Sequence, residues 1–204
     1  HDSNAYRTTG VDENIANMTY KEVRRLDAGS WYSDEYKGEK VPGLREVLEL
    51  AQGKIKLNIE LKPADNSEEL ARKTVALIEK YNMENDCVIT SFSSSALSAA
   101  KSCDENIRVG YILSAAYGDY YDMKNIDFFS VNAAFLSKRT IDAIHNSGKQ
   151  VYAWTVNNKD SIKNLTNKGV DGVITDNPVL ARETIYSRDT SETIVNMIRY
   201  VFNQ

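Results

Sequence analysis

Residue types that commonly build thiol and metal chemistry are scarce in this sequence, whose 204 residues include two cysteines, two histidines and three prolines. Cys87 and Cys103 match no zinc-binding spacing and form no CxxC pair, which argues against a zinc centre or a dithiol centre. Because unpaired cysteine is among the most buried residue types, we expect two buried free thiols. A bridge between them stays open if the domain lies outside the cell.

Long apolar runs and an excess of positive charge are also missing. No apolar stretch approaches the roughly 20 residues that cross a bilayer, and 25 basic against 29 acidic residues give a formal net charge of -4. Overall charge therefore does not favour nucleic acid or an anionic membrane as a partner. An anionic substrate would need a local cationic site or a metal.

The start of the chain carries no targeting signal. It opens on His1-Asp2 without an initiator methionine, and no signal peptide is recognisable. We therefore expect a domain of a longer protein, so the missing signals say little about where the parent lies.

The sequence does contain a regular alternation of strand-like and helical runs. Helical patterns are followed by strand-like runs all along the chain from residue 42 onward, which predicts parallel strands joined by right-handed crossovers. The strand-like runs lie at 54–62, 87–92, 108–113, 127–132, 150–156 and 172–175, and the helical patterns at 42–53, 66–81, 93–102, 137–147 and 158–168.

Two of the helical patterns give detailed expectations. Asn66 with Glu69 three residues later predicts a capped start, and a buried stripe is predicted for this helix. The last pattern predicts that Ile162 and Leu165 face inward, with a glycine just past the helix end. The members of the predicted stripe are Leu70, Thr74, Leu77, Ile78 and Tyr81.

Parallel strands with crossover helices can form an open doubly wound sheet or a closed barrel. Strands covered on both faces of an open sheet are nearly continuously apolar. The run at 54–62 instead alternates, with Ile59 and Leu61 on one face and Glu60 and Lys62 on the other. This favours an α/β fold of the (β/α)₈ TIM barrel type, with the polar face in the lumen.

The predicted barrel is incomplete. Eight βα units need about 250 residues, so six units correspond to the third to eighth strands. Residues 1–40 are polar, with a short helical stretch near 19–26, and are predicted to be an insertion beside the barrel mouth. The barrel domain is thus predicted over 1–186. Residues 187–204 are predicted to form an extra C-terminal helix.

Glu60 and Lys62 are the most informative polar pair, because they stand two apart at the carboxyl end of a strand and so face the same way. Catalytic groups gather at that end of a barrel. A carboxylate can bind a hard cation there and a lysine can hold a phosphate, although a purely structural ion pair has the same spacing. His145, near a helix end, is expected to have a structural role.

Several segments together resemble the glycerophosphodiester phosphodiesterase family. HDSNAYRTTG at 1–10 is similar to its His-Asp segment, and LNIELK at 57–62 matches its Glu-Leu-Lys motif. The later strands follow in order as VITSF at 88–92, FFSVN at 128–132, VYAWTVNN at 151–158 and GVDGVITDNP at 169–178. The amino-acid sequence of these segments is most similar to that of bacterial members whose catalytic domain follows a membrane region. This implies a membrane-attached or extracytoplasmic parent, with a cytoplasmic one still open.

The resemblance implies roles for five residues. His1 would exchange a proton with glycerol oxygens, Glu60 would bind a divalent metal, either Ca²⁺ or Mg²⁺, and Lys62 would contact the phosphodiester. Phe92 and Trp154 would line the glycerol side of the substrate. Hydrolysis would yield glycerol 3-phosphate and an alcohol.

The sequence departs from the family pattern at two motifs. A His-Arg-Gly motif and a Glu-x-Asp pair on the first two strands have no match, so the second histidine and two of three metal carboxylates are missing. We therefore expect the chain alone to be inactive, and its exposed sheet edges to self-associate. Two alternatives stay open: a non-catalytic phosphate-ligand or interaction domain, and another lyase or phosphodiesterase on the same barrel.

Overall fold

The computed structural model describes residues 1–115, 118 and 120–186. By their internal contacts these residues divide into two compact units, with the boundary between Ile55 and Lys56. The helical tail predicted at 187–204 lies outside the described residues. The division into a barrel over 1–186 and an insertion over 1–40 stays a prediction.

The first unit consists of short helical elements joined by turns, as expected from its lack of strand-helix alternation. The helical stretch predicted near 19–26 is shorter, because α2 starts after a capping box between Thr19 and Glu22 and ends after one turn. An isolated antiparallel bridge joins Asn4 and Asn14. The elements are α1 (Tyr6–Thr9), η1 (Ile15–Asn17), α2 (Tyr20–Val23), η2 (Asp34–Tyr36) and α3 (Leu44–Ala51).

A single carboxylate organises the loop that follows α2. Asp27 accepts hydrogen bonds from the backbone N–H groups of Gly29 and Ser30 at 3.0 Å and of Gly38 at 2.9 Å, and from the Ser30 hydroxyl at 2.7 Å. These bonds, that of the Ser30 hydroxyl first, hold the pKa of Asp27 well below its usual range. Only glycine fits at position 29, since a Cβ there would lie 1.9 Å from the Tyr36 carbonyl oxygen.

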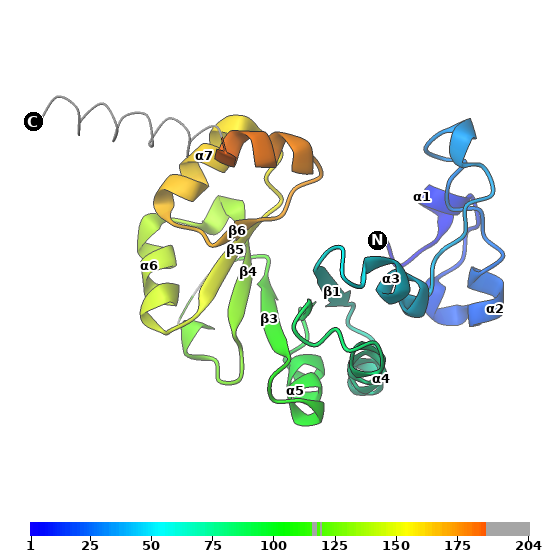
Figure 1. Cartoon of the computed structure of the whole chain (residues 1–204), viewed down its shortest axis with the longest axis horizontal. Helices are drawn as coiled ribbons and strands as arrows, with labels where there is room; N and C mark the ends of the chain where they lie inside the picture. The colour runs from blue at the N-terminus through cyan, green and yellow to red at the C-terminus, as the bar shows by residue number, and fades with distance from the viewer. Residues whose placement is uncertain (116–117, 119, 187–204) are drawn as a thin grey trace, which may run out of the picture. The chain divides into compact units, whose positions relative to one another are not determined.

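The second unit is built on one parallel sheet. Its six strands are hydrogen-bonded in their sequence order, from β1 to β6 (Figure 1). Each strand falls within a predicted run; β3 has the predicted bounds, and the other strands are shorter than their runs. The strands are β1 (Leu57–Leu61), β2 (Cys87–Ser91), β3 (Arg108–Leu113), β4 (Phe128–Asn132), β5 (Gln150–Trp154) and β6 (Gly172–Val173).

This strand order distinguishes between the two predicted arrangements, the open doubly wound sheet and the closed barrel. A doubly wound sheet reverses its strand order at a switch point, whereas the order here runs in one direction without reversal. Consecutive neighbours are the arrangement of a barrel wall. The second unit is therefore a curled, barrel-like α/β sheet, which confirms the predicted fold class.

The helices of the second unit start and end close to the predicted positions. In α7, Ile162 and Leu165 are buried and Gly169 ends the helix with a positive φ of 95°, as predicted. Figure 1 shows α6 lying along the strands β4 and β5. The helices are α4 (Ser67–Lys80), α5 (Ser94–Cys103), α6 (Lys138–Asn146) and α7 (Lys159–Lys168), with 3₁₀ turns η3 (Tyr120–Asp122) and η4 (Ala133–Phe135).

Two details predicted for α4 are wrong. Asn66 occupies the N-cap position but its side chain makes no capping hydrogen bond, because its backbone is not extended; the Ser67 hydroxyl bonds Ala64 instead. Leu70 is 36% exposed. The buried stripe is rotated toward Ala71 and Val75, small side chains that suit the close packing of α4 on α5.

The concave face of the sheet is packed rather than hollow along β3 to β5. The Phe128 and Tyr152 rings lie 4.7 Å apart between centroids, and Arg108 lies over the Phe128 ring. Gly110 is required beside them, since a Cβ there would meet the Phe128 ring at 2.1 Å. Barrel interiors are filled in this way by side chains of neighbouring strands.

Two aspartates fasten the amino ends of neighbouring strands in the same way. Asp127 precedes β4 and bonds Val109 of β3 twice, through its N–H and its carboxylate, at 2.9 and 2.7 Å. Asp171 precedes β6 and bonds Val151 of β5 twice, at 2.9 and 2.8 Å. Lys101 contacts the carboxylate of Asp127 at 2.9 Å.

Within the described ranges, no helix combines the length and the apolar character that crossing a bilayer requires.

Candidate active site

Glu60 and Lys62 lie together at the carboxyl end of β1. The Lys62 Nζ is 3.2 Å from the Glu60 Oε1, and both side chains are partly exposed, at 50% and 30%. The prediction that they face the same way is confirmed. Burial alternates along β1, with Leu61 buried and Glu60 exposed, because neighbouring residues of a strand point to opposite faces of the sheet.

The strand register places other predicted residues on the same face as Glu60. Glu60 is level with Thr90, Thr90 with Gly110, Gly110 with Phe128, and Phe128 with Gln150. Trp154 follows Gln150 by four residues and Phe92 follows Thr90 by two, so both share this face by the two-residue period. Of these residues, Trp154 ends β5 and Phe92 follows the end of β2, so these two lie at the carboxyl edge of the sheet.

Phe92 and Trp154 are in direct contact. Their ring centroids are 6.4 Å apart with an interplanar angle of 87°, an edge-to-face contact. The Trp154 Nε1–H donates to the Ser130 carbonyl at 3.0 Å, which fixes the indole. Phe92 is 38% exposed, so the pair forms an aromatic wall that is open on one side.

His1 belongs to the first unit, where it contacts Asp2, which in turn contacts Arg7. Its Nδ1 lies 3.1 Å from the Asp2 Oδ1, and the Arg7 Nε donates to the Asp2 Oδ2 at 2.6 Å. The hydrogen bond and charge of Asp2 raise the pKa of the Arg7 guanidinium. Sequence patterns do not predict the Asp2–Arg7 pair, because it forms only when the α1 turn brings position 7 back to position 2. That His1 approaches Glu60 and Lys62 stays a prediction.

His145 lies away from the carboxyl edge. It is in the last turn of α6, and its Nε2 is 2.9 Å from the Asp171 Oδ2, at the amino end of β6. Its predicted structural role is consistent with this contact. His145 therefore does not supply a second histidine beside Glu60 and Lys62.

Other polar residues after β4, β5 and β6 bond to the chain itself. The Asn132 Oδ1 accepts from the Ala134 N–H at 3.0 Å. The Asn157 Nδ2 donates to the Asp176 Oδ2 at 2.7 Å, and the Asn157 Oδ1 accepts from the Asp176 N–H at 2.9 Å. These bonds shape the loops at the carboxyl edge.

The described residues do not complete a metal site. Ca²⁺ takes six to eight oxygen ligands and Mg²⁺ takes six, yet among the described residues no three acidic, histidine or cysteine side chains gather as a metal would need. Glu60 offers one carboxylate. The Glu-x-Asp tripeptide at 84–86 precedes β2, at the opposite edge of the sheet, so it does not join Glu60.

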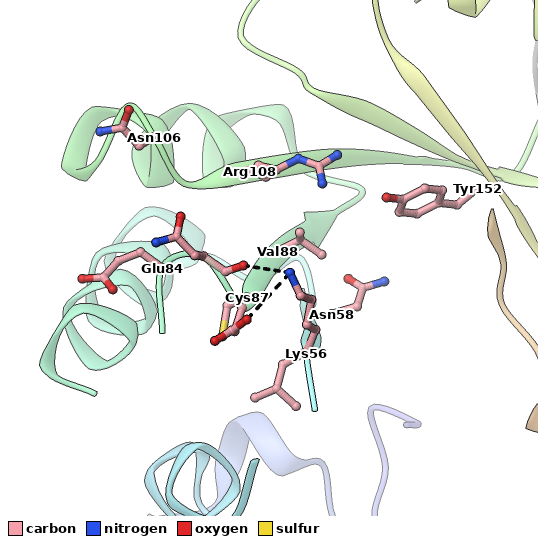
Figure 2. A pocket seen from close by; sticks show the side chains of 11 residues that line it. Lys56, Asn58, Glu84, Cys87, Val88, Asn106, Arg108 and Tyr152 are labelled. Atoms are coloured by element: carbon pink, nitrogen blue, oxygen red, sulfur yellow. Dashed lines mark hydrogen bonds and ion pairs between the residues drawn. The ribbon is translucent and has the colours of Figure 1, made fainter. Parts of the chain in front are cut away.

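A cavity of about 320 Å³ opens at that opposite edge. Figure 2 shows the Lys56 amino group facing oxygens of the loop before β2: the Asn85 carbonyl at 3.3 Å and the Asp86 carboxylate at 3.7 Å. Arg108 and Tyr152 line its other side. None of the predicted site residues lines this cavity, and the amino edge of a barrel serves stability rather than catalysis.

The two cysteines are free, and only one of them is buried. Cys87 in β2 is 2% exposed, and burial raises the pKa of its thiol to about 11. Cys103 is exposed, so the prediction that both are buried is wrong for this residue. Its place as the last residue of α5 turns it toward solvent.

Comparison with known proteins adds independent support for the fold. The model of the glycerophosphoryl diester phosphodiesterase family matches residues 1–180. The chain belongs to this family. The family resemblance inferred from the order of the strand-end motifs is thereby confirmed.

Individual phosphodiesterases of the family are similar over most of their length. A glycerophosphodiester phosphodiesterase of Caldanaerobacter subterraneus is 27% identical, covering 98% of this chain and 79% of the relative. A phosphodiesterase structure from Oleispira antarctica, in complex with the product sn-glycerol-3-phosphate, is 30% identical with a TM-score of 0.79, covering 91% and 77%. A Parabacteroides distasonis structure, 21% identical with a TM-score of 0.80, supports the fold.

Proposed function

We propose that the protein hydrolyses glycerophosphodiesters to sn-glycerol 3-phosphate and an alcohol. The observation that carries this proposal is the placement of Glu60, Lys62, Phe92 and Trp154 on one face at the carboxyl edge of the sheet. A site for a phosphate joined to a small polyol requires a cation, a carboxylate and an aromatic wall, and this edge offers all three. Membership of the phosphodiesterase family supports the same reaction.

Lys62 is proposed to bind the phosphodiester. Its ammonium lies 3.2 Å from Glu60, so it is held at the strand end while remaining half exposed to a ligand. A fixed positive charge stabilises the negative charge that develops on the phosphoryl oxygens in the transition state. Phe92 and Trp154 would contact the carbon side of the glycerol, since ring surfaces pack well against C–H groups.

His1 is proposed to transfer a proton to the leaving oxygen. In the hydrolysis, the oxygen of water bonds to phosphorus while the bond from phosphorus to the alcohol oxygen breaks. The alkoxide takes its proton from the imidazolium of His1. Asp2 at 3.1 Å supports the protonated ring. The proton that water loses requires a second base, which the family pattern supplies from a motif that this sequence does not contain.

Glu60 is proposed to contribute one ligand to a divalent cation, either Ca²⁺ or Mg²⁺. Such an ion supplies charge stabilisation to a phosphoryl group when bound. One carboxylate does not make the site, and we propose that two further carboxylates come from the second-strand Glu-x-Asp motif that this sequence does not contain. We accordingly propose that the 204-residue chain alone is inactive.

Binding to the 204-residue chain tests the site without requiring turnover. Calorimetric titration with sn-glycerol 3-phosphate should show saturable binding that Lys62→Ala weakens about tenfold, the loss of one charge-assisted contact. Lys56→Ala is the matched control, because Lys56 lies at the other end of the same strand-like run. Equal binding by both variants would remove Lys62 from the proposed site.

Turnover tests the reaction. The 204-residue chain should not release glycerol 3-phosphate from glycerophosphocholine with Mg²⁺ or Ca²⁺, whereas a chain extended by a segment carrying both missing motifs should. In the extended chain, His1→Ala should lower kcat about a hundredfold or more. Robust turnover by the 204-residue chain refutes its inactivity. Binding without turnover in the extended chain favours the non-catalytic phosphate-ligand domain.

Self-association is proposed from the sheet edges. In the described part of the chain, no strand pairs with the outer sides of β1 and β6, and unpaired edges are templates for further strands. A concentration-independent monomer in small-angle scattering contradicts this.

A membrane-attached or extracytoplasmic parent is proposed from the similarity of the segments DSN and TDNPVLAR to bacterial members of the family. Fractionation of cells that produce the parent protein tests this proposal.

A further inference from the structure

Two segments at the carboxyl edge of the second unit are joined by side chains that the proposed chemistry does not use. Asn157, after β5, donates through Nδ2 to the Asp176 Oδ2 at 2.7 Å and accepts through Oδ1 from the Asp176 N–H at 2.9 Å. The Thr175 hydroxyl donates to the same Oδ1 at 3.0 Å. Both polar atoms of the Asn157 side chain are therefore bonded to the segment that follows β6.

These bonds begin where the backbone pairing of β5 with β6 runs out. Past the two residues of β6, the Ile174 N–H donates to the Ala153 carbonyl at 2.8 Å and the Val156 N–H to the Ile174 carbonyl at 2.9 Å. Within the described ranges, β6 pairs with no strand on its other side. Since short edge segments open readily by local unfolding, the Asn157 side chain extends the connection at a point where it would otherwise fray.

Trp154 lies between two fixed points of this structure. Its Nε1–H donates to the Ser130 carbonyl of β4 at 3.0 Å, and three residues later the Asn157 side chain holds the backbone to the segment after β6. The indole itself is only partly buried. Because the rotamers open to a side chain depend on its backbone dihedral angles, a restraint on the backbone after Trp154 also restrains the ring.

The exposure of the Asn157 bonds argues for a local effect. Asn157 and Asp176 are both exposed, and a hydrogen bond that replaces bonds to water adds little to overall stability. Local placement is a different matter, since a displacement of about 1 Å in a group that positions a ligand can lower a rate about a hundredfold. The network is therefore better suited to fixing a side chain than to stabilising the fold.

We infer that Asn157 and Asp176 are positioning residues, which hold the backbone that follows Trp154 and so keep the indole in the aromatic wall beside Phe92. The inference rests on the proposed function, since the wall contacts the ligand of that same site. Neither Asn157 nor Asp176 has to touch the ligand. Loss of the network should act through the indole, and should have no effect on binding once the indole is removed.

A double-mutant cycle on the 204-residue chain tests this dependence, with sn-glycerol 3-phosphate as the ligand in calorimetric titrations. Asn157→Ala should weaken binding about fivefold on its own and cause no further loss when it is added to Trp154→Ala, because the two changes remove one interaction. Equal losses in both backgrounds would show that Asn157 acts independently of the indole and would overturn the inference.

Exchanging the two partners tests the contact without removing the indole. Asn157→Asp places two carboxylates opposite each other and should weaken binding at least as much as Asn157→Ala. Adding Asp176→Asn restores one amide opposite one carboxylate, so the exchanged pair should regain most of the affinity. An exchanged pair that binds no better than Asn157→Asp alone contradicts the positioning role.

Asn158→Ala is the matched control, because Asn158 is the next residue but caps α7, with its Oδ1 accepting from the Ser161 N–H at 2.8 Å. Loss of a helix cap destabilises a fold. Asn158→Ala should therefore lower the midpoint of urea unfolding and retain the affinity, whereas Asn157→Ala should lower the affinity and change the midpoint less. If affinity falls in both variants in step with the midpoint, the effect is one of folding and the inference is wrong.

Hydrogen exchange of the indole N–H groups gives a signature at the ring itself. The chain has two tryptophans, and the Trp31 Nε1–H, bonded to the Ala28 carbonyl in the first unit, is an internal reference. Asn157→Ala should speed exchange at Trp154 about tenfold, as its bond to Ser130 opens more often, and leave Trp31 unchanged. Unaltered exchange at Trp154 would count against the inference.

The unchanged chain separates this failure from that of the proposed function. If it binds sn-glycerol 3-phosphate through Lys62 while Asn157→Ala binds equally well, only the positioning role is lost. If the unchanged chain does not bind sn-glycerol 3-phosphate, the proposed function fails and the positioning role fails with it.

Discussion

Phe92 and Trp154 touch each other although two strands, β3 and β4, lie between the strands that carry them. Neighbouring strands are about 4.8 Å apart, so three steps across a flat sheet would separate these positions by about 14 Å. A centroid distance of 6.4 Å requires that the sheet bends around them. The aromatic wall of the proposed site is thus a consequence of the curvature.

Removing the Phe92 ring should weaken ligand binding with little effect on stability. Phe92→Ala is expected to lower the affinity for sn-glycerol 3-phosphate about fivefold, while the free energy of unfolding falls by only about 1 kcal/mol, because the ring is partly exposed. Phe92→Leu should retain most of the affinity. Titration calorimetry and urea unfolding check the two effects separately; unchanged affinity in the alanine variant would exclude the ring from the site.

Removing the Asp171 carboxylate should destabilise the fold. Asp171→Ala leaves the buried Val151 N–H without its acceptor and His145 without its partner, so unfolding should become easier by about 2 kcal/mol. Asp142→Ala is the control, because Asp142 makes an exposed ion pair with Lys138 one helical turn away and should cost about 0.5 kcal/mol or less. Similar losses in both variants would contradict the fastening role of Asp171.

The sequence predicted the elements of the sheet well, and the positions of individual side chains less well. The two-residue period of β1 fixes the face of Glu60 whatever surrounds it. The buried stripe of α4 was misjudged at Leu70, because helical periodicity shows that one side is apolar without showing that Ala71 allows the closer approach. Bonds such as Asp171 to Val151 depend on strand register, which no single segment encodes.

The candidate site was predictable to the extent that it follows strand ends. Glu60 is the last residue but one of β1, Lys62 and Phe92 directly follow β1 and β2, and Trp154 ends β5. Parallel strands bring those ends to one edge. The Asp2–Arg7 pair and the ring contacts of Trp31 come from turns of irregular backbone. Neither hydrophobic periodicity nor motif order reports such turns.

The two cysteines should differ in reactivity. With its pKa raised to about 11 by burial, Cys87 is a thiolate in only about one molecule in ten thousand at pH 7, and its side chain is inaccessible. Titration with a chromogenic disulfide at pH 8 should therefore modify one thiol, Cys103, quickly, and the second only in urea. Two equally fast thiols would contradict the burial of Cys87.

The same pKa shift predicts a pH dependence of stability. A thiol whose pKa is raised on folding contributes stability that is complete below its ordinary pKa, near 9, and is lost as the pH rises toward 11. The free energy of unfolding of Cys87→Ala should consequently fall less between pH 9 and 11 than that of the unchanged chain. Parallel curves for the two proteins would show that Cys87 does not contribute.

Asp27 predicts the opposite dependence, at acidic pH. Its pKa is lowered on folding, so its stabilising hydrogen bonds are complete above its ordinary pKa, near 4, and are lost as the pH falls below that value. Above pH 4, Asp27→Asn should increase hydrogen exchange at the Gly29, Ser30 and Gly38 amides. Asp34→Asn, an exposed carboxylate in the same loop, should leave these amides unchanged.

The fastenings made by Asp127 and Asp171 all lie at one rim of the sheet. The carboxyl edge of the sheet does not depend on these hydrogen bonds. Its connecting segments can therefore be lengthened, shortened or exchanged while Asp127 and Asp171 continue to hold the amino ends of the strands. An engineer who wished to give this scaffold a different phosphodiester preference could therefore graft new segments after β2, β4 or β5 and leave residues 127 and 171 untouched.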